Sequence, residues 1–92
     1  MSILTTRVQQ SQIIDIIYYD KEINLLGVHF KTSDVTWVYE DVPAHVFGVL
    51  VSSASVGSFF IRHVRNEYAA HKIERSFYAE AKKAKKIKRQ LQ

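Results

Sequence analysis

The sequence predicts an α+β domain: a three-stranded antiparallel β-meander followed by two helices packed on one face, plus a basic C-terminal helix. Before Pro43, apolar side chains alternate with polar ones, which is the period of a strand. After Pro43 they recur about every 3.6 residues, which is the period of a helix. The 92 residues suffice for one domain, which we place at residues 1–73 with a helical tail at 74–92.

The first predicted strand covers residues 12–20, where isoleucine and tyrosine side chains alternate around one aspartate. Asp15 would share its face with Ile17 and Tyr19, and its charge marks that face as the wetter one. The opposite face is predicted to be the drier one. It carries Ile14, Ile16 and Tyr18.

The other two strands follow after short turns. Residues 25–31 form the second, and the third surrounds Trp37, where every bulky side chain is β-branched or aromatic. Pro43 ends the third strand, because proline has no N–H for the ladder. Connections this short join antiparallel neighbours, so the three strands form a meander. The inward side chains of the second strand are Leu26, Val28 and Phe30.

A first helix is predicted directly after Pro43, whose fixed φ suits the first turn of a helix. A cluster of serines at residues 52–55 interrupts it. Ser53 or Ser55 would cap the next helix, because a serine hydroxyl accepts a free amide hydrogen of the first turn. The apolar face of the first helix comprises Val46, Phe47, Leu50, Val51 and Ala54.

The second helix is predicted to run on toward Lys72. Phe60, Val64 and Tyr68 recur at every fourth position and would face the sheet. Another face of the same helix would carry a basic stripe. Its basic members are Arg62, Arg65 and Lys72.

The C-terminal tail holds most of the positive charge. The whole chain has a formal net charge of +4, and eight basic and two acidic residues give residues 72–92 a net charge of +6. Residues 75–91 predict an amphipathic helix whose apolar line runs through Phe77, Ala81, Ala84 and Leu91. Such a tail favours polyanions. Six basic residues lie within eight positions: Lys82, Lys83, Lys85, Lys86, Lys88 and Arg89.

Composition narrows the classes of function. The chain has no cysteine, which excludes disulfides, thiolate zinc sites and cysteine nucleophiles. The four histidines are scattered without metal-ligand spacing, so we expect no metal, no cofactor and no enzymatic activity. No apolar run approaches the length of a membrane span, and the N-terminal segment lacks the apolar core of a signal peptide. We therefore expect a cytoplasmic protein without integral membrane association.

The order of several short motifs resembles the KTSC domain, a module found at the C-terminus of some lysyl-tRNA synthetases and as stand-alone bacterial and phage proteins. The resemblance extends over residues 7–73, and the tail lies outside it. It implies an α+β fold and suggests RNA binding. Ile61 and Asn66 depart from it, where the family more often has a polar residue and glycine. The motifs are Ser11, Tyr19-Asp20, residues 26–30, Trp37-x-Tyr39, Val42-Pro43, residues 54–60, residues 62–65 and Tyr68.

Trp37 and Tyr39 have two interpretations. On an open sheet face they would stack on nucleic-acid bases. Under the helices they would belong to the core together with Val35, and large aromatic side chains dominate cores. We favour the core but keep both residues as stacking candidates.

The basic residues and one serine motif also have two interpretations each. Arg62, Arg65, Lys72 and the tail would contact phosphates, or would simply keep a helix face solvated. About five phosphate contacts would give a log–log salt slope near −4 to −5. Residues 55–57 would hold an anion on free amides, but Ser55 as a cap with Gly57 for close packing is the simpler explanation.

Three functional hypotheses follow. The first is a non-enzymatic module that binds RNA or DNA through the basic tail and the basic helix face. The second is a protein-interaction module, such as a phage-type regulator that binds a host protein machine with its amphipathic tail. The third is binding of the tail helix to the surface of anionic membranes.

Overall fold

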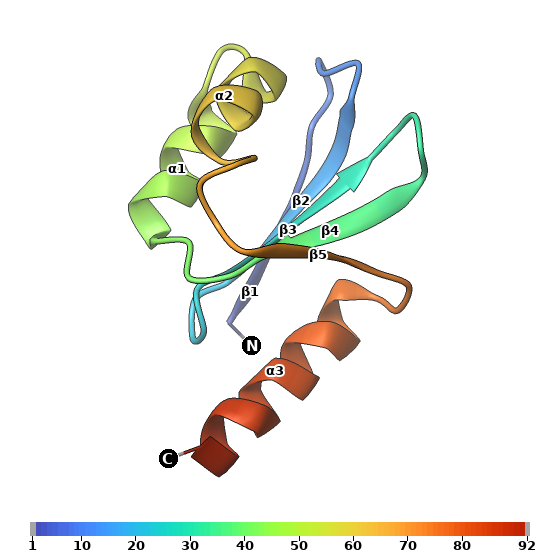
Figure 1. The fold of residues 1–92 in the computed structure, drawn as a ribbon. Coiled ribbons are helices and arrows are strands. Elements are labelled where there is room, and N and C mark those ends of the chain that lie inside the picture. Colours follow the sequence, from blue (N-terminus) through green and yellow to red (C-terminus); the bar gives the residue numbers. More distant parts are fainter. Residues whose placement is uncertain (1, 92) are drawn as a thin grey trace.

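The computed structural model describes residues 2–91 and shows one antiparallel sheet with helices on both faces (Figure 1). The strands are β1 (Ile3–Arg7), β2 (Ile14–Asp20), β3 (Leu25–Phe30), β4 (Val35–Tyr39) and β5 (Ala70–Ile73). The helices are α1 (Ala44–Ser52), α2 (Val56–His63) and α3 (Phe77–Leu91). The predicted α+β class is therefore confirmed.

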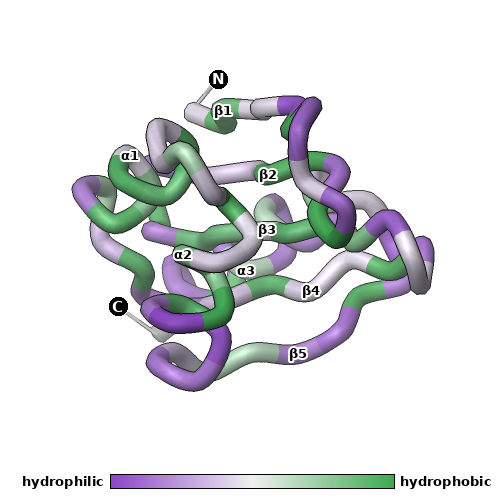
Figure 2. The backbone as a smooth tube through the Cα atoms, turned by 90° about the horizontal axis from the view of Figure 1, so that it is seen from above, coloured by the Kyte–Doolittle hydropathy of each residue, from purple (hydrophilic) through white to green (hydrophobic). Residues whose placement is uncertain are grey.

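The sheet has five strands in the order β1-β2-β3-β4-β5, and Figure 2 shows them side by side in that order. The predicted meander of three strands, now β2 to β4, is present, but the number of strands was wrong. The two missed strands are the edges of the sheet. β1 pairs only with β2 and β5 only with β4, so backbone pairing rather than an apolar pattern of their own keeps them in place.

A β-bulge at Asp15 changes the predicted faces of β2. Ile14 pairs with Phe30, whereas Ile16 pairs with His29, so Asp15 is the extra residue on its strand. The alternation resets there, and Ile17 joins Ile14 in the main core instead of facing the wetter side. At the bulge the carboxylate of Asp15 lies 3.2 Å from Nδ1 of His29 on the neighbouring strand.

The second predicted helix is shorter than expected. α2 ends at His63, and a turn at residues 64–67 leads back to the free edge of β4, where β5 pairs. Lys72 is therefore a strand residue opposite Trp37, and the basic helical stripe through Arg62, Arg65 and Lys72 was wrong. The helical spacing of apolar residues continues beyond the end of α2 because two residues after the helix also pack on the core. These are Val64, which is fully buried, and Tyr68, which is half-buried.

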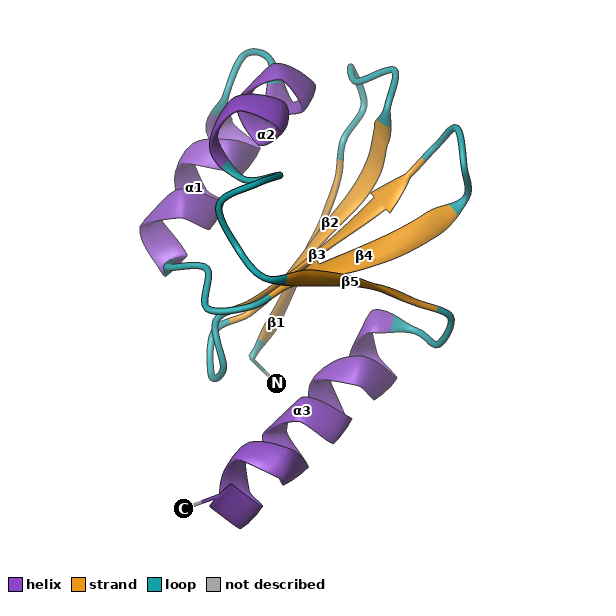
Figure 3. Cartoon of the chain, in the orientation of Figure 1, coloured by secondary structure: helices purple, strands orange, loops and turns teal. Residues whose placement is uncertain are grey.

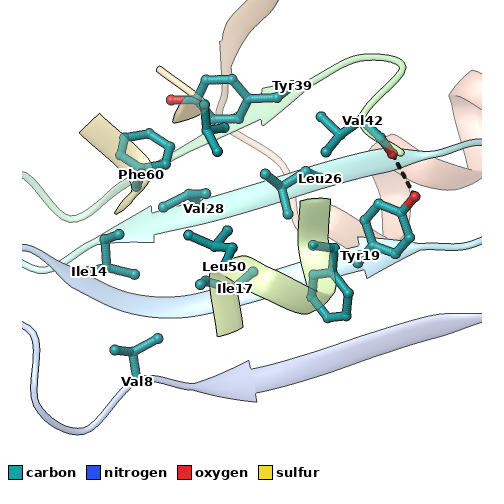
Figure 4. Close-up of a cluster of buried hydrophobic side chains, with 12 residues drawn as sticks. Val8, Ile14, Ile17, Tyr19, Leu26, Val28, Tyr39, Val42, Leu50 and Phe60 are labelled. Carbon is teal, nitrogen blue, oxygen red and sulfur yellow. Dashed lines mark hydrogen bonds between the residues drawn. The ribbon is translucent and has the colours of Figure 1, made fainter. Parts of the chain in front are cut away.

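The main core lies between the sheet and the α1–α2 pair (Figure 4). Tyr19 stacks on Phe47 of α1 with ring centroids 4.7 Å apart, and its hydroxyl donates a hydrogen bond of 2.6 Å to the carbonyl oxygen of Val42. This bond ties β2 to the residue before Pro43, and so positions the start of α1. Leu50 of α1 and Phe60 of α2 complete the contact with the sheet.

Helix α3 lies on the opposite face of the sheet (Figure 3). Phe77 stacks on Tyr18 of β2 with ring centroids 5.0 Å apart and is 2% exposed. Gly27 makes this possible, because a Cβ atom there would lie 2.7 Å from Cε1 of Phe77. The predicted apolar line along the tail is confirmed for Phe77 and Ala81, while the side chain of Leu91 lies outside the described residues.

Candidate nucleic-acid interface

The outer face of α3 carries exposed basic side chains. The helix has 15 residues, and its buried members Phe77 and Ala81 define the inner side. On the outer side, basic residues follow one another over two turns. No ion pair among residues 2–91 involves them. We call this set the outer α3 face: Lys82, Lys83, Lys86 and Arg89.

Two of the six predicted tail contacts are used inside the molecule instead. Nζ of Lys85 lies 2.9 Å from Oδ2 of Asp20, which is fully buried, and 3.1 Å from the carboxylate of Glu22. Nζ of Lys88 lies 3.5 Å from the carbonyl oxygen of Ile23. Lys85 therefore holds α3 on the sheet, and the longer contact of Lys88 directs its ammonium group toward the sheet as well, so we remove both from the candidate nucleic-acid contacts.

The Lys85–Asp20 ion pair explains how a carboxylate is buried under α3. Oδ1 of Asp20 accepts a hydrogen bond from the amide of Glu22, and Oδ2 has no partner among residues 2–91 except the ammonium group of Lys85. The hydrogen bond to Asp20 raises the pKa of Lys85, and contacts with Ser2 and Lys85 lower the pKa of Glu22. Lys85 and Glu22 are therefore both charged at neutral pH.

The remaining predicted basic residues lie on the other side of the sheet. Arg62 is in the last turn of α2, and Arg65 follows that helix. Lys72 is directly opposite Trp37 in the β4–β5 ladder, and such pairs share one face of a sheet. The sheet separates these residues from the outer α3 face, so one continuous basic surface does not form (Figure 3).

A groove lies between the end of α2 and strands β4 and β5. It has a volume of about 610 Å³. Trp37 is 36% exposed in it, whereas Tyr39 belongs to the main core and is only 4% exposed. The two stacking candidates therefore differ in burial, and of the two only the side chain of Trp37 is substantially accessible to a ligand. We call this feature the Trp37 groove; its other polar or charged lining residues are Thr32, Ser33, Arg65 and Asn66.

The serine motif before α2 serves packing. Ser55 is the N-cap residue, but its hydroxyl makes no cap hydrogen bond. A Cβ atom at Gly57 would lie 3.2 Å from the side chain of Ile13, so glycine allows the close approach of α2 to the start of β2. The predicted role of Gly57 in close packing agrees with this geometry, whereas the predicted cap bond of Ser55 was wrong.

The part of the chain that the structure describes offers neither a metal centre nor a membrane-spanning helix. Within residues 2–91, no three histidine, cysteine, aspartate or glutamate side chains gather in a way that would hold a metal ion. None of the helices in this range has the length and apolar character needed to cross a bilayer.

Sequence reasoning missed two members of these sites. Asp20 was noted only as the last residue of the first predicted strand and as part of a family motif, and its ion pair with Lys85 joins residues 65 positions apart, which no local pattern reveals. Asn66 was noted only as a departure from a family pattern. Its place in the Trp37 groove depends on where α2 ends, which the apolar period concealed.

These features define a small α+β domain with a basic appended helix, and comparison with known proteins identifies its family. The family model for the KTSC domain matches residues 10–68, so the chain belongs to the KTSC domain family. The match ends before β5 and α3. No match to a curated protein was found.

A solved structure supports this assignment. The crystal structure of a KTSC domain protein from Yersinia pestis is similar to this chain, with a TM-score of 0.72 and 27% sequence identity. The similarity covers 97% of that chain but 77% of this one. About a quarter of this chain therefore has no counterpart there.

Proposed function

We propose that this protein is a non-enzymatic nucleic-acid-binding module that contacts phosphates through the outer α3 face. One observation carries the proposal: Lys82, Lys83, Lys86 and Arg89 are all exposed and take part in no ion pair among residues 2–91, while the inner side of the same helix packs on the sheet. A helix anchored in this way presents its charges without the entropy cost of ordering a free tail.

The geometry of the helix sets the size of the contact. Lys82 and Arg89 are seven residues apart, a rise of about 10 Å along the axis, which matches about three phosphates of one strand. Three to four contacts give a log–log salt slope near −2 to −4. This range replaces the steeper slope expected when Lys85 and Lys88 were counted as contacts.

RNA is the nucleic acid that we propose first. The support is the resemblance to a module that occurs at the C-terminus of some lysyl-tRNA synthetases, together with a charged surface that reads phosphates rather than base sequence. On this basis we expect weakly sequence-selective binding in the cytoplasm.

Fluorescence anisotropy tests the proposal with labelled tRNA, single-stranded RNA and duplex DNA over a salt series. The double variant Lys82→Gln/Lys86→Gln is expected to reduce the salt slope by about 2 for duplex DNA and to weaken binding to every ligand. The matched control Lys21→Gln/Lys31→Gln removes the same charge from turns of the sheet and should change affinity much less. Equal losses in both variants would reject the outer α3 face as the interface.

Substitution is preferable to deletion of the tail in this experiment. Removing residues 82–92 would also remove Lys85, which neutralises the buried Asp20, and would shorten the helix that covers one sheet face. A loss of binding after deletion would then report damage to the fold as well as loss of charge.

The protein-interaction hypothesis is our second proposal. In it, the apolar side of the tail enters the groove of a partner such as a host protein machine. That side already packs on the sheet through Phe77 and Ala81, so the partner would first have to displace α3. A pull-down with and without nuclease separates the two proposals, because a protein partner of this kind remains bound after nuclease treatment.

A further inference from the structure

The Trp37 groove brings together an exposed aromatic side chain, the hydroxyl of a largely buried tyrosine and the free positive charge of Arg65. Its floor is apolar: Phe60 lies beneath it, with its ring centroid 5.4 Å from that of Tyr39. Its volume of about 610 Å³ is in the range of sites that take small molecules. The indole of Trp37 forms part of the lining and is open to solvent.

The hydroxyl group of Tyr39 is a hydrogen-bonding group in the Trp37 groove. The side chain is 4% exposed, yet its hydroxyl makes no hydrogen bond within residues 2–91. Figure 4 shows this hydroxyl directed away from Leu26 and Val42 in the core. Burial raises the pKa of Tyr39 to about 12, against the opposing effect of the nearby guanidinium of Arg65. The hydroxyl oxygen itself is not among the buried atoms that lack a partner within residues 2–91, so at neutral pH the groove presents a neutral O–H that a ligand can reach.

Charge complementarity points to an anionic ligand. Among the lining residues Arg65 is charged, and none is acidic. Lys72 is opposite Trp37 on the same face and adds a second cation beside the groove. Arg65 and Lys72 take part in no ion pair among residues 2–91. A flat aromatic ligand that carries its own phosphate fits such a site.

We propose that the Trp37 groove binds one unpaired nucleotide of a single-stranded nucleic acid. The base stacks on the indole of Trp37, and its polar edge hydrogen-bonds to the hydroxyl of Tyr39 and the amide of Asn66. Arg65 contacts the adjoining phosphate. A base within a duplex cannot enter, because its faces are covered by its neighbours. The inference rests on the proposed nucleic-acid-binding function but uses a surface on the other side of the sheet.

The chain contains a single tryptophan, so tryptophan fluorescence reports on the Trp37 groove alone. We expect single-stranded tetranucleotides of uridine and of adenosine to quench the fluorescence of Trp37 saturably, through stacking on the indole. A blunt-ended hairpin with a stem long enough to remain fully paired should quench much less, because its bases are covered by their neighbours. Saturable quenching by the hairpin to the same extent would overturn the proposal.

Three variants separate stacking, hydrogen bonding and charge. Tyr39→Phe keeps the ring and removes only the unpartnered hydroxyl, so the fold should persist while tetranucleotide affinity falls about three- to tenfold. Arg65→Gln should lower affinity and reduce the salt slope by about 1, and the matched control Arg62→Gln should not. Trp37→Leu, followed by anisotropy of a labelled tetranucleotide, should lose about tenfold or more.

The outer α3 face provides the control that distinguishes the two proposals. Lys82→Gln/Lys86→Gln should leave quenching by a tetranucleotide unchanged while it weakens binding of long RNA. If long RNA binds without any quenching of Trp37, this inference is overturned, whereas the proposed binding of phosphates by the outer α3 face is still supported. Quenching that persists with the same affinity in Tyr39→Phe and Arg65→Gln also overturns it.

Discussion

The two faces of the sheet are covered in different ways. On the α1–α2 face, a cluster of twelve buried residues fills the space between sheet and helices. On the α3 face the cluster has only six, and a buried ion pair between Lys85 and Asp20 adds to it. The first face is stabilised mainly by apolar burial, whereas the second depends on a narrow apolar contact and on one charge being matched.

This difference indicates that α3 is the more separable part of the molecule. The family match ends at residue 68, so the core of the family does not include it. Each face also leaves a different kind of surface: the outer α3 face is a row of charges, and the Trp37 groove is an apolar opening with a charged rim. Substitutions that act on one face alone test whether the two faces are stabilised in these different ways.

The largest effect is expected from Leu50→Ala on the α1–α2 face. Leu50 is fully buried, and its loss leaves a cavity in the main core. We expect the free energy of unfolding to fall by about 2–5 kcal/mol in a single cooperative transition. Urea denaturation followed by circular dichroism measures it. A loss confined to the signal of α3 would show that the main core is not what holds the sheet together.

The next effect is expected from Gly27→Ala on the α3 face. The new Cβ atom would lie 2.7 Å from Cε1 of Phe77, so the ring has to leave its place on Tyr18. We expect a loss of about 1–3 kcal/mol. Hydrogen exchange should quicken in α3 before it does in α1.

Gly48→Ala is the matched control for Gly27→Ala. Gly48 lies in the middle of α1, and a Cβ atom added there would meet no other atom within 4 Å, so alanine restricts only the unfolded chain and favours the helix. We expect a gain of up to about 1 kcal/mol. If both substitutions destabilise equally, the close fit between Gly27 and Phe77 does not hold α3.

Lys85→Met should have a somewhat smaller effect. It leaves the carboxylate of Asp20 buried with only the amide of Glu22 as a partner. We expect the free energy of unfolding to fall by about 1–2 kcal/mol. Lys82→Met removes the same charge from the outer α3 face and should change stability by less than about 0.5 kcal/mol. Equal effects would mean that Lys85 acts only through net charge.

Alkaline pH tests both faces together and gives the smallest effect. Burial raises the pKa of Tyr39 to about 12, and the hydrogen bond to Asp20 raises the pKa of Lys85 above its ordinary value of 10.5. The folded state thus keeps protons that the unfolded chain releases. Both contributions are complete below the pKa of the unfolded chain and are lost as the pH rises through the folded pKa.

At a pH of about 11 we expect the raised pKa of Tyr39 to have lowered the free energy of unfolding by about 1 kcal/mol. Urea denaturation at a series of pH values measures this loss, and ultraviolet absorption follows tyrosinate formation. Tyr39→Phe should remove part of the alkaline loss. An unchanged profile in that variant would mean that Tyr39 ionises as readily in the folded state as in the unfolded one.

The sequence alone predicted those strands and helices whose own residues show a regular spacing of apolar side chains. The strands around Ile17, Val28 and Trp37 and the helix at Leu50 were predicted because burial repeats within each segment. β5 has a single buried residue, Ile73, so its pattern could not reveal a strand. Edge strands of this kind are specified by the partner that they pair with.

The candidate sites were harder to predict for the same physical reason. That Trp37 and Tyr39 share a face followed from strand alternation, but Tyr39 is the more buried because Phe60 of α2 packs on it, which is a long-range contact. The density of lysines predicted a basic tail, yet the partition into Lys85 toward the sheet and Lys82 toward solvent required a long-range contact with Asp20. Charge density is local information, whereas charge pairing is not.

The order of the strands has a consequence for the speed and sequence of folding. β1 to β4 each pair with the strand next to them in the chain, whereas β5 reaches β4 only after both α1 and α2. Adjacent hairpins close short loops cheaply, and the return of β5 closes a long one. We therefore expect amide protection to develop in β2 and β3 before β5, and pulsed hydrogen exchange during refolding would show the reverse order if the last strand instead acted as the nucleus.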